Sequence, residues 1–103
     1  MLRHIVMWTL KDHAEGADRA TNIRKVQEML ESCSALVPGI VYFKVAVATP
    51  GLETTCDILL DSTFASKQAL DAYQTHPTHV GIKPFVGAVR RERQCCDFEV
   101  PDR

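Results

Sequence analysis

The sequence predicts an α+β domain in which two helices pack on one face of a four-stranded antiparallel sheet. The chain has 103 residues, enough for one domain of common size and too few for a second independent core. Runs rich in β-branched and aromatic residues alternate with segments whose apolar residues recur at helical spacing, and proline and glycine mark the boundaries. We therefore expect the element order β-α-β-β-α-β in a single domain spanning residues 1–103, with its core in residues 2–99.

The first strand and the first helix are expected before residue 37. Residues 2–10 are mostly β-branched, aromatic or otherwise apolar, which favours a strand. Residues 17–36 have a helical pattern that ends at Pro38-Gly39, because proline holds the preceding residue in extended geometry and glycine permits a turn. The apolar stripe of this helix consists of Ile23, Val26, Leu30, Cys33 and Leu36.

Two further strands are expected to form a hairpin. Residues 40–48 and residues 54–61 both favour a strand. The segment Thr49-Pro50-Gly51 lies between them and is a strong turn signal. The two strands should therefore be neighbours in the sheet.

The last helix and the last strand complete the pattern. Ser66 is expected to cap a helix that runs through Thr75, and Pro77 is expected to stop it. Residues 85–93 are predicted as the final strand, followed by a polar tail. The resulting order is that of the ferredoxin-like fold, which leaves one face of the sheet without helices.

The strands predict that this second face is apolar as well. A sheet with one solvated face should alternate apolar and polar residues, and two of these strands do not. A monomer rarely exposes an apolar patch as large as a whole sheet face. Because two-fold dimers are the commonest oligomers, we expect a homodimer whose two sheets face each other as a barrel. The first strand places His4, Val6, Trp8 and Leu10 on one face and Ile5 and Met7 on the other; the second opposes Val41, Phe43, Val45 and Val47 to Ile40, Tyr42, Ala46 and Ala48.

Composition excludes several classes of function. The formal net charge is -1 and no basic block is long enough to hold a phosphate backbone, so nucleic acid is not an expected partner. The sequence has neither a signal peptide nor a run of about 20 apolar residues, which predicts a cytoplasmic protein that does not span a membrane. The four cysteines include no CxxC pair, so neither a disulfide framework nor a zinc site is expected.

Three residues in the segment 73–79 could take part in general acid–base catalysis. Tyr73, His76 and His79 lie within seven residues, and His4 is the one histidine among the inward positions of the first strand. Histidine suits a general base near neutral pH, and a tyrosine hydroxyl can donate to a developing oxyanion. The competing interpretation is structural: Tyr73 anchors the core through its ring, His76 caps a turn, and His4 is a core histidine.

The sequence resembles the stress-responsive A/B barrel (Dabb) family over residues 2–99. Its Tyr-x-x-His-Pro-x-His segment after a leading His-Ile-Val strand is fairly specific for that family. The resemblance implies a dimeric barrel of ferredoxin-like subunits, in agreement with the dimer expected from the strand pattern. The residues that carry it are His4-Ile5-Val6, Pro38-Gly39, Asp57, Phe64, Tyr73, His76-Pro77-Thr78-His79 and Asp97-Phe98.

The resemblance also implies an activity. A characterised plant member of the family cyclises a linear polyketide thioester by aldol chemistry, and its catalytic tyrosine and histidine match Tyr73 and His79 here. A histidine of its first strand, which matches His4, lies in the same cavity. In such chemistry His79 would take a proton alpha to a carbonyl, while Tyr73 would hydrogen-bond the thioester or enolate oxygen.

The first helix argues for a smaller ligand than a polyketide. It carries Ile23, Val26, Met29 and Leu30 but no aromatic side chain to hold an acyl tail, and Trp8 narrows the pocket further. We expect a small apolar or carbonyl-containing ligand between helices and sheet, without a cofactor. The expected catalytic residues are His79 and Tyr73, and the expected binding residues are His4, Val6, Trp8, His76, Ile23 and Leu30.

Other functions stay open on the sequence alone. The first hypothesis is a small-molecule-binding barrel with cyclase-like or lyase-like proton transfer. The second is a non-enzymatic stress or assembly protein, and the third is a cofactor-free monooxygenase of the related dimeric barrels. A metal site at His4, His76 and His79 is disfavoured, because Pro77 interrupts the His-x-x-His pair. The run at residues 90–93 favours protection of a sheet edge and no binding site.

Overall fold

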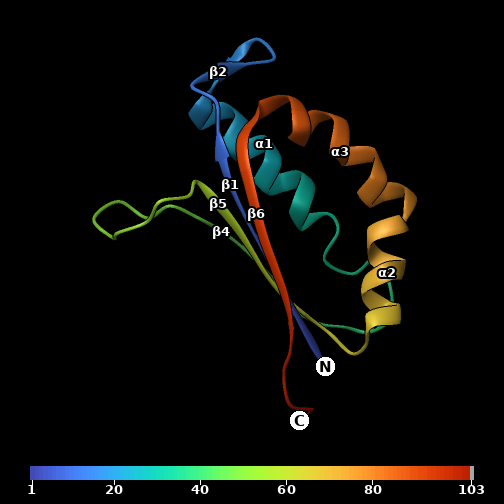
Figure 1. Ribbon diagram of the computed structural model, residues 1–103. Coiled ribbons are helices and arrows are strands. Elements are labelled where there is room, and N and C mark those ends of the chain that lie inside the picture. The colour runs from blue at the N-terminus through green and yellow to red at the C-terminus, as the bar shows by residue number, and fades with distance from the viewer. Residues whose placement is uncertain (103) are drawn as a thin grey trace.

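Residues 1–102 are described by the computed structural model, which has a ferredoxin-like α+β fold. A four-stranded sheet and three helices form the body of the molecule (Figure 1). The elements in chain order are β1 (Leu2–Leu10), β2 (His13–Ala14), β3 (Ala17–Asp18), α1 (Arg19–Glu31), β4 (Ile40–Val47), β5 (Ile58–Phe64), α2 (Lys67–Thr75), α3 (Pro77–Val89) and β6 (Arg90–Glu99).

The sheet is antiparallel throughout, with the strand order β4-β5-β1-β6. The central strand β1 pairs with β5 and β6, and its residue His4 lies opposite Ser62 on one side and Asp97 on the other. The three helices lie on one side of this sheet, and α2 leads directly into α3 (Figure 1). The two chain ends meet beside β1, where the amino group of Met1 donates to the carbonyl of Val100 at 3.0 Å.

The first strand is confirmed, whereas the helix expected at residues 17–36 is shorter. A small hairpin of β2 and β3 precedes it, so α1 begins at Arg19, after Asp18. The Asp18 side chain accepts a hydrogen bond from the backbone N–H of Thr21 at 2.8 Å and caps the helix. After Glu31 the chain continues in turns that still bury Cys33. The helix predicted from the spacing of apolar residues is therefore longer than α1 at both ends.

The hairpin of β4 and β5 is confirmed, with shifted boundaries. The strand expected at residues 54–61 is β5, which begins and ends later in the chain. The backbone N–H of Cys56 donates a hydrogen bond to the Thr54 hydroxyl at 3.2 Å, and this bond holds the preceding segment in a turn. In β4 the pairing register shifts between Ile40 and Tyr42. Val41 is the extra residue of this irregularity and is exposed, so the regular alternation predicted for the second strand does not hold at its start.

The largest difference from the sequence prediction is a third helix. The sequence predicts an irregular segment after Pro77 and a strand from Phe85. These residues instead form helix α3, and the final strand β6 follows this helix. The Nδ1 atom of His76 accepts from the backbone N–H of Thr78 at 3.1 Å, so His76 caps α3. Pro77 occupies the first turn, where a missing N–H costs nothing. Pro84 lies inside the helix at an exposed position.

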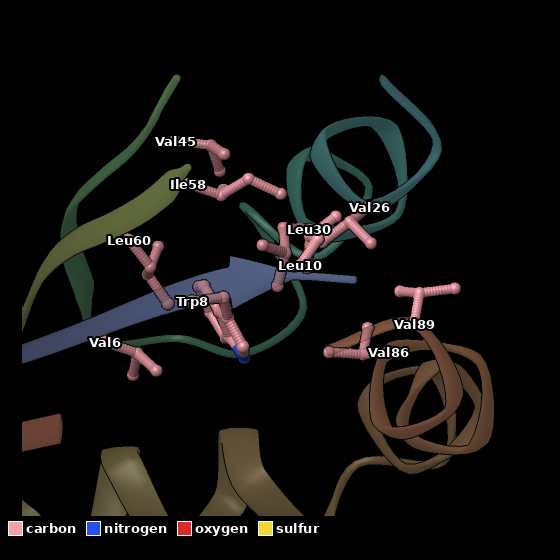
Figure 2. Close-up of a cluster of buried hydrophobic side chains, with 10 residues drawn as sticks. All are labelled: Val6, Trp8, Leu10, Val26, Leu30, Val45, Ile58, Leu60, Val86 and Val89. Carbon is pink, nitrogen blue, oxygen red and sulfur yellow. The ribbon is translucent and has the colours of Figure 1, made fainter. Parts of the chain in front are cut away.

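The core lies between the sheet and the helices and forms two clusters. One lies under α1 and α3, and Figure 2 shows Leu10 of β1 beside Val26 and Leu30 of α1, with Val86 and Val89 of α3 facing them. The second lies under α2 and contains Cys33, Phe64, Ala69, Leu70 and Tyr73.

The opposite face of the sheet is covered by no helix of the described chain (Figure 1). Ile5 and Met7 of β1 and Leu59 of β5 point there and are partly exposed, while Tyr42 and Phe98 are 49% and 46% exposed. We call these side chains the outer face. None of the helices in residues 1–102 is long and apolar enough to cross a membrane.

Candidate functional site

A cavity of about 300 Å³ lies between the helix-facing side of the sheet and helices α2 and α3. Side chains of β1, β5, β6 and all three helices contribute to its wall. Much of that wall is apolar, and Figure 2 shows five of its members, Val6, Trp8, Leu30, Leu60 and Val86, projecting from different elements into the core. The other lining residues are His4, Tyr73, Gln74, His79, Ile82, Lys83, Gly87, Arg90 and Arg93.

Tyr73 lines the cavity from α2 and is fully buried, with 0% relative exposure. Its ring packs on the ring of His79 with centroids 4.5 Å apart, and on Phe64 at 5.2 Å. Burial, with a smaller effect of Cys33, raises the pKa of the phenol above its ordinary value, so the hydroxyl keeps its proton at neutral pH. This buried hydroxyl has no hydrogen-bond partner among residues 1–102. A buried hydrogen-bond donor without a partner in the described chain therefore belongs to a residue of the cavity wall.

His79 lies in the first turn of α3 and is half-buried. Its Nδ1 atom is 3.2 Å from the backbone oxygen of Gln74. Because a carbonyl only accepts, Nδ1 carries the proton, and Nε2 of the neutral ring keeps its lone pair. Burial is the largest cause and lowers the pKa of His79. The Gln74 hydrogen bond opposes this effect, and the nearby Lys83, His4 and Arg93 lower the pKa by smaller amounts. The ring is therefore a neutral base at neutral pH.

His4 enters the cavity from β1 and is 3% exposed. Its Nδ1 atom is 2.5 Å from a carboxylate oxygen of Asp97, which lies directly opposite on β6. This contact fixes the ring orientation, and the His4 centroid is 6.5 Å from that of Tyr73. The sheet register thus brings a third polar side chain to the pair made by His79 and Tyr73.

Six of the eight residues expected at the site line the cavity, and two do not. His76 caps α3 and Ile23 packs against the first core cluster, so neither contributes to the wall. The six that do are His79, Tyr73, His4, Val6, Trp8 and Leu30. Within residues 1–102 no group of three or more His, Cys, Asp or Glu side chains is arranged to hold a metal ion.

Most of the other lining residues belong to α3 and β6. The sequence did not predict the helix α3, and it predicted wrong bounds for the final strand β6. Ile82, Lys83, Val86 and Gly87 belong to the missed helix, and Arg93 is on the strand that follows. The missed signal was spacing: His79, Ile82, Val86 and Val89 recur at helical intervals across Pro84. Arg90 and Arg93, assigned no site from the sequence, both line the cavity.

Comparison with known proteins agrees with this fold. The family model described as "Stress responsive A/B Barrel Domain" matches residues 2–100. A search of the curated proteins gave no match. A dimeric protein of unknown function from Bacteroides fragilis is 26% identical, with a TM-score of 0.79 over 96% of this chain and 95% of that one.

Two more solved structures share the fold at lower identity. A Dabb family protein with a ferredoxin-like fold from Mesorhizobium loti is 18% identical, with a TM-score of 0.67 over 98% of this chain and 97% of that one. A protein described as an antibiotic biosynthesis monooxygenase is 13% identical, with a TM-score of 0.72 over 99% and 100% of the two chains. The match of the family model to residues 2–100 shows that the chain belongs to the stress responsive A/B barrel domain family.

Proposed function

We propose that the cavity binds a small, largely apolar carbonyl compound and that His79 and Tyr73 catalyse proton transfer on it. The observation that carries this proposal is the contact between the two rings, with centroids 4.5 Å apart, in the wall of a cavity that is also lined by apolar side chains. A base and a hydroxyl donor held side by side are the two groups that enolisation of a carbonyl compound requires.

The proposed step transfers one proton to His79 and shifts the C–H and carbonyl π electron pairs of the ligand. Nε2 of His79 takes the proton alpha to the carbonyl, and the released C–H pair forms the carbon–carbon double bond of an enolate. The carbonyl π pair moves to oxygen, where the Tyr73 hydroxyl donates a hydrogen bond. The raised pKa of Tyr73 keeps that donor protonated, and the lowered pKa of His79 keeps the base free. Buried donors of this kind act strongly because little water competes with them.

Exchange of alpha protons for deuterium tests the proposal. Octan-2-one in D2O, followed by proton NMR with and without the protein, reports proton abstraction directly. We expect acceleration by the wild type, and a loss of about a hundredfold or more in His79→Ala and in Tyr73→Phe. Thr78→Ala changes an exposed neighbour on α3 and is the matched control. An unaltered rate in both site variants would refute the assignment of these two residues.

The outer face supports a further proposal, that two copies of this chain pair through their sheets. Ile5, Met7 and Leu59 leave an apolar surface that no helix of residues 1–102 covers. The Bacteroides fragilis relative is described as dimeric, and homodimers commonly bury such surfaces. In this assembly the cavity stays on the opposite side of each sheet, so each subunit carries its own site.

Two alternative functions have distinct outcomes. If ligands enter the cavity but no exchange is accelerated, the protein is a binding or assembly protein without catalysis. A cofactor-free monooxygenase is favoured only by its fold, since the relative described in that way is 13% identical. Oxygen uptake in the presence of a quinol would identify that activity.

A further inference from the structure

Three positively charged side chains line the cavity. Lys83 comes from α3, Arg93 from β6, and Arg90 from the junction between them. All three are exposed, so they stand where the cavity meets the surface, while the apolar side chains Val6 and Leu60 are buried within. No Asp or Glu is among the lining residues. The wall therefore combines an apolar interior with a cationic mouth.

This concentration of positive charge is local. The chain as a whole has a formal net charge of -1, so cations at one opening do not reflect a basic protein. The ion pairs found within residues 1–102 engage other cations, such as Arg3 with Asp61 and Arg91 with Asp12. The nearby carboxylate of Asp97 is directed to His4. The charges at the mouth thus have no protein counterion in the described chain.

The positive charges at the mouth also act electrostatically on His79, which lines the same cavity. The charges of Lys83 and Arg93 contribute to the lowered pKa of His79, although burial is the larger cause. Electrostatic effects of surface groups are weak unless water is partly excluded between the charges. A charged group of a ligand near His79 would therefore interact with the same two cations.

We infer that the ligand of this cavity is an organic anion, whose carboxylate or phosphate group is held at the mouth by Lys83, Arg90 and Arg93 while its apolar part lies inside. This inference rests on the proposed function, because it names the class of ligand for the same cavity. Guanidinium groups bind carboxylate and phosphate oxygens through paired hydrogen bonds, and lysine adds a point charge. The volume of about 300 Å³ restricts the ligand to a small molecule.

Trp8 provides the measurement. It is the only tryptophan of the chain and it lines the cavity, so its fluorescence reports occupancy. Three probes contain eight carbon atoms each: octanoate, octyl phosphate and octanamide. We expect at least one anion to bind about tenfold or more tightly than octanamide, because hydrogen bonds to charged groups are the stronger ones. The ranking of the two anions identifies which head group is preferred.

Variants at the mouth separate charge from shape. Arg93→Gln and Lys83→Gln should each weaken binding of the preferred anion several-fold, and the double variant should bring it close to octanamide. Arg91→Gln is the matched control, because Arg91 is a neighbouring exposed arginine that pairs with Asp12 and does not line the cavity. Raising NaCl to 0.5 M should weaken the anion and leave octanamide unchanged, since salt screens exposed charges.

The outcomes distinguish this inference from the proposed function. Equal binding of octanamide and both anions, unchanged in the double variant, would overturn the anion inference and leave the cavity as a site for neutral ligands. If no probe alters Trp8 fluorescence, both the inference and the small-molecule site are wrong. If the anion binds as expected but His79→Ala does not reduce alpha-proton exchange, the inference stands and the proposed catalysis fails.

Discussion

At the scale of single residues, the site depends on two side chains whose surroundings shift their pKa values in useful directions. Tyr73 is buried in a ring cluster that keeps its hydroxyl protonated, and that hydroxyl has no partner among residues 1–102. A purely structural tyrosine usually satisfies its hydroxyl when it is buried. The unpartnered donor beside a neutral histidine supports the role proposed for Tyr73 as a donor to a ligand.

Tyr73→Phe should remove function without removing the fold. The variant keeps the ring that packs on His79 and Phe64 and deletes only a buried hydroxyl that makes no hydrogen bond in the described chain. The free energy of unfolding should stay within about 1 kcal/mol of the wild type or increase. Urea denaturation followed by circular dichroism measures this. A loss of several kcal/mol would mean that the hydroxyl has a structural partner.

The pH dependence of exchange should follow His79. Only its neutral ring can accept a proton, so the rate rises with pH as the ring loses its charge, and the lowered pKa places this rise below the ordinary value of 6.5. The positive charges of Lys83 and Arg93 contribute to that lowering, so Lys83→Gln and Arg93→Gln should move the rise toward higher pH. A pH–rate profile, with an NMR titration of the imidazole, checks both statements. A profile that does not move in either variant would show that these cations act elsewhere.

At the scale of elements, the site depends on how closely α2 packs against the chain that enters β4. Gly39 precedes β4 with a φ of 93°, and a Cβ atom placed there would lie 2.8 Å from the Cβ of Ala69 on α2. The next turn of α2 carries Tyr73, so this close approach helps to set the depth of the tyrosine in the core. Pro38-Gly39 therefore ends the segment after α1 and also leaves room for the second helix.

Gly39→Ala should destabilise the protein more than Gly16→Ala. Both glycines have a positive φ, so both variants carry the strain of a side chain in the left-handed region, about 1–2 kcal/mol. Only at position 39 would the new methyl group collide with a neighbour, because nothing lies within 4 Å at position 16. Urea denaturation of the pair measures the cost of the α2 contact as a difference. Equal losses would show that α2 moves away freely.

At the scale of the whole molecule, the two faces of the sheet have different surroundings. Helices cover one face (Figure 1). The cavity lies between these helices and the strands. On the outer side of the sheet Arg3 donates two hydrogen bonds to Asp61, at 2.7 Å and 2.9 Å, and the apolar side chains of Ile5 and Met7 lie on the same side of β1. This pattern favours a self-complementary interface, because a few polar groups fix the register while apolar area supplies affinity.

Met7→Glu should convert the proposed dimer into single subunits. Met7 lies on the outer face of the central strand β1, where a new carboxylate would be buried without a partner on association. Sedimentation equilibrium at micromolar concentration should give twice the 11.5 kDa mass of one chain for the wild type and the single mass for the variant. His13→Glu adds the same charge on the exposed hairpin and should leave the dimer intact. A wild type of single-chain mass would refute the proposed pairing.

The sequence by itself determined those elements that depend only on residue types within a few positions. The strand at residues 2–10, the cap at Ser66 and the turn at Pro38-Gly39 before β4 each follow from residue types within a few positions, whereas the end of α1 at Glu31 does not. The pair formed by Tyr73 and His79 was also visible, because both residues belong to one short segment. The order of the predicted elements and the family resemblance pointed to the correct fold, because the strands and the family motifs are read directly from the sequence.

Only the tertiary structure decided which distant residues meet in the cavity. The segment after Pro77 suits a strand or a helix by composition, and packing of Ile82 and Val86 against the core selects the helix. That choice moves the start of β6 to Arg90, and a shift of one residue along a strand exchanges its two faces. The register of β6 therefore places Asp97 beside His4 and Arg93 at the cavity mouth, because strand pairing is a long-range contact that local propensity does not encode.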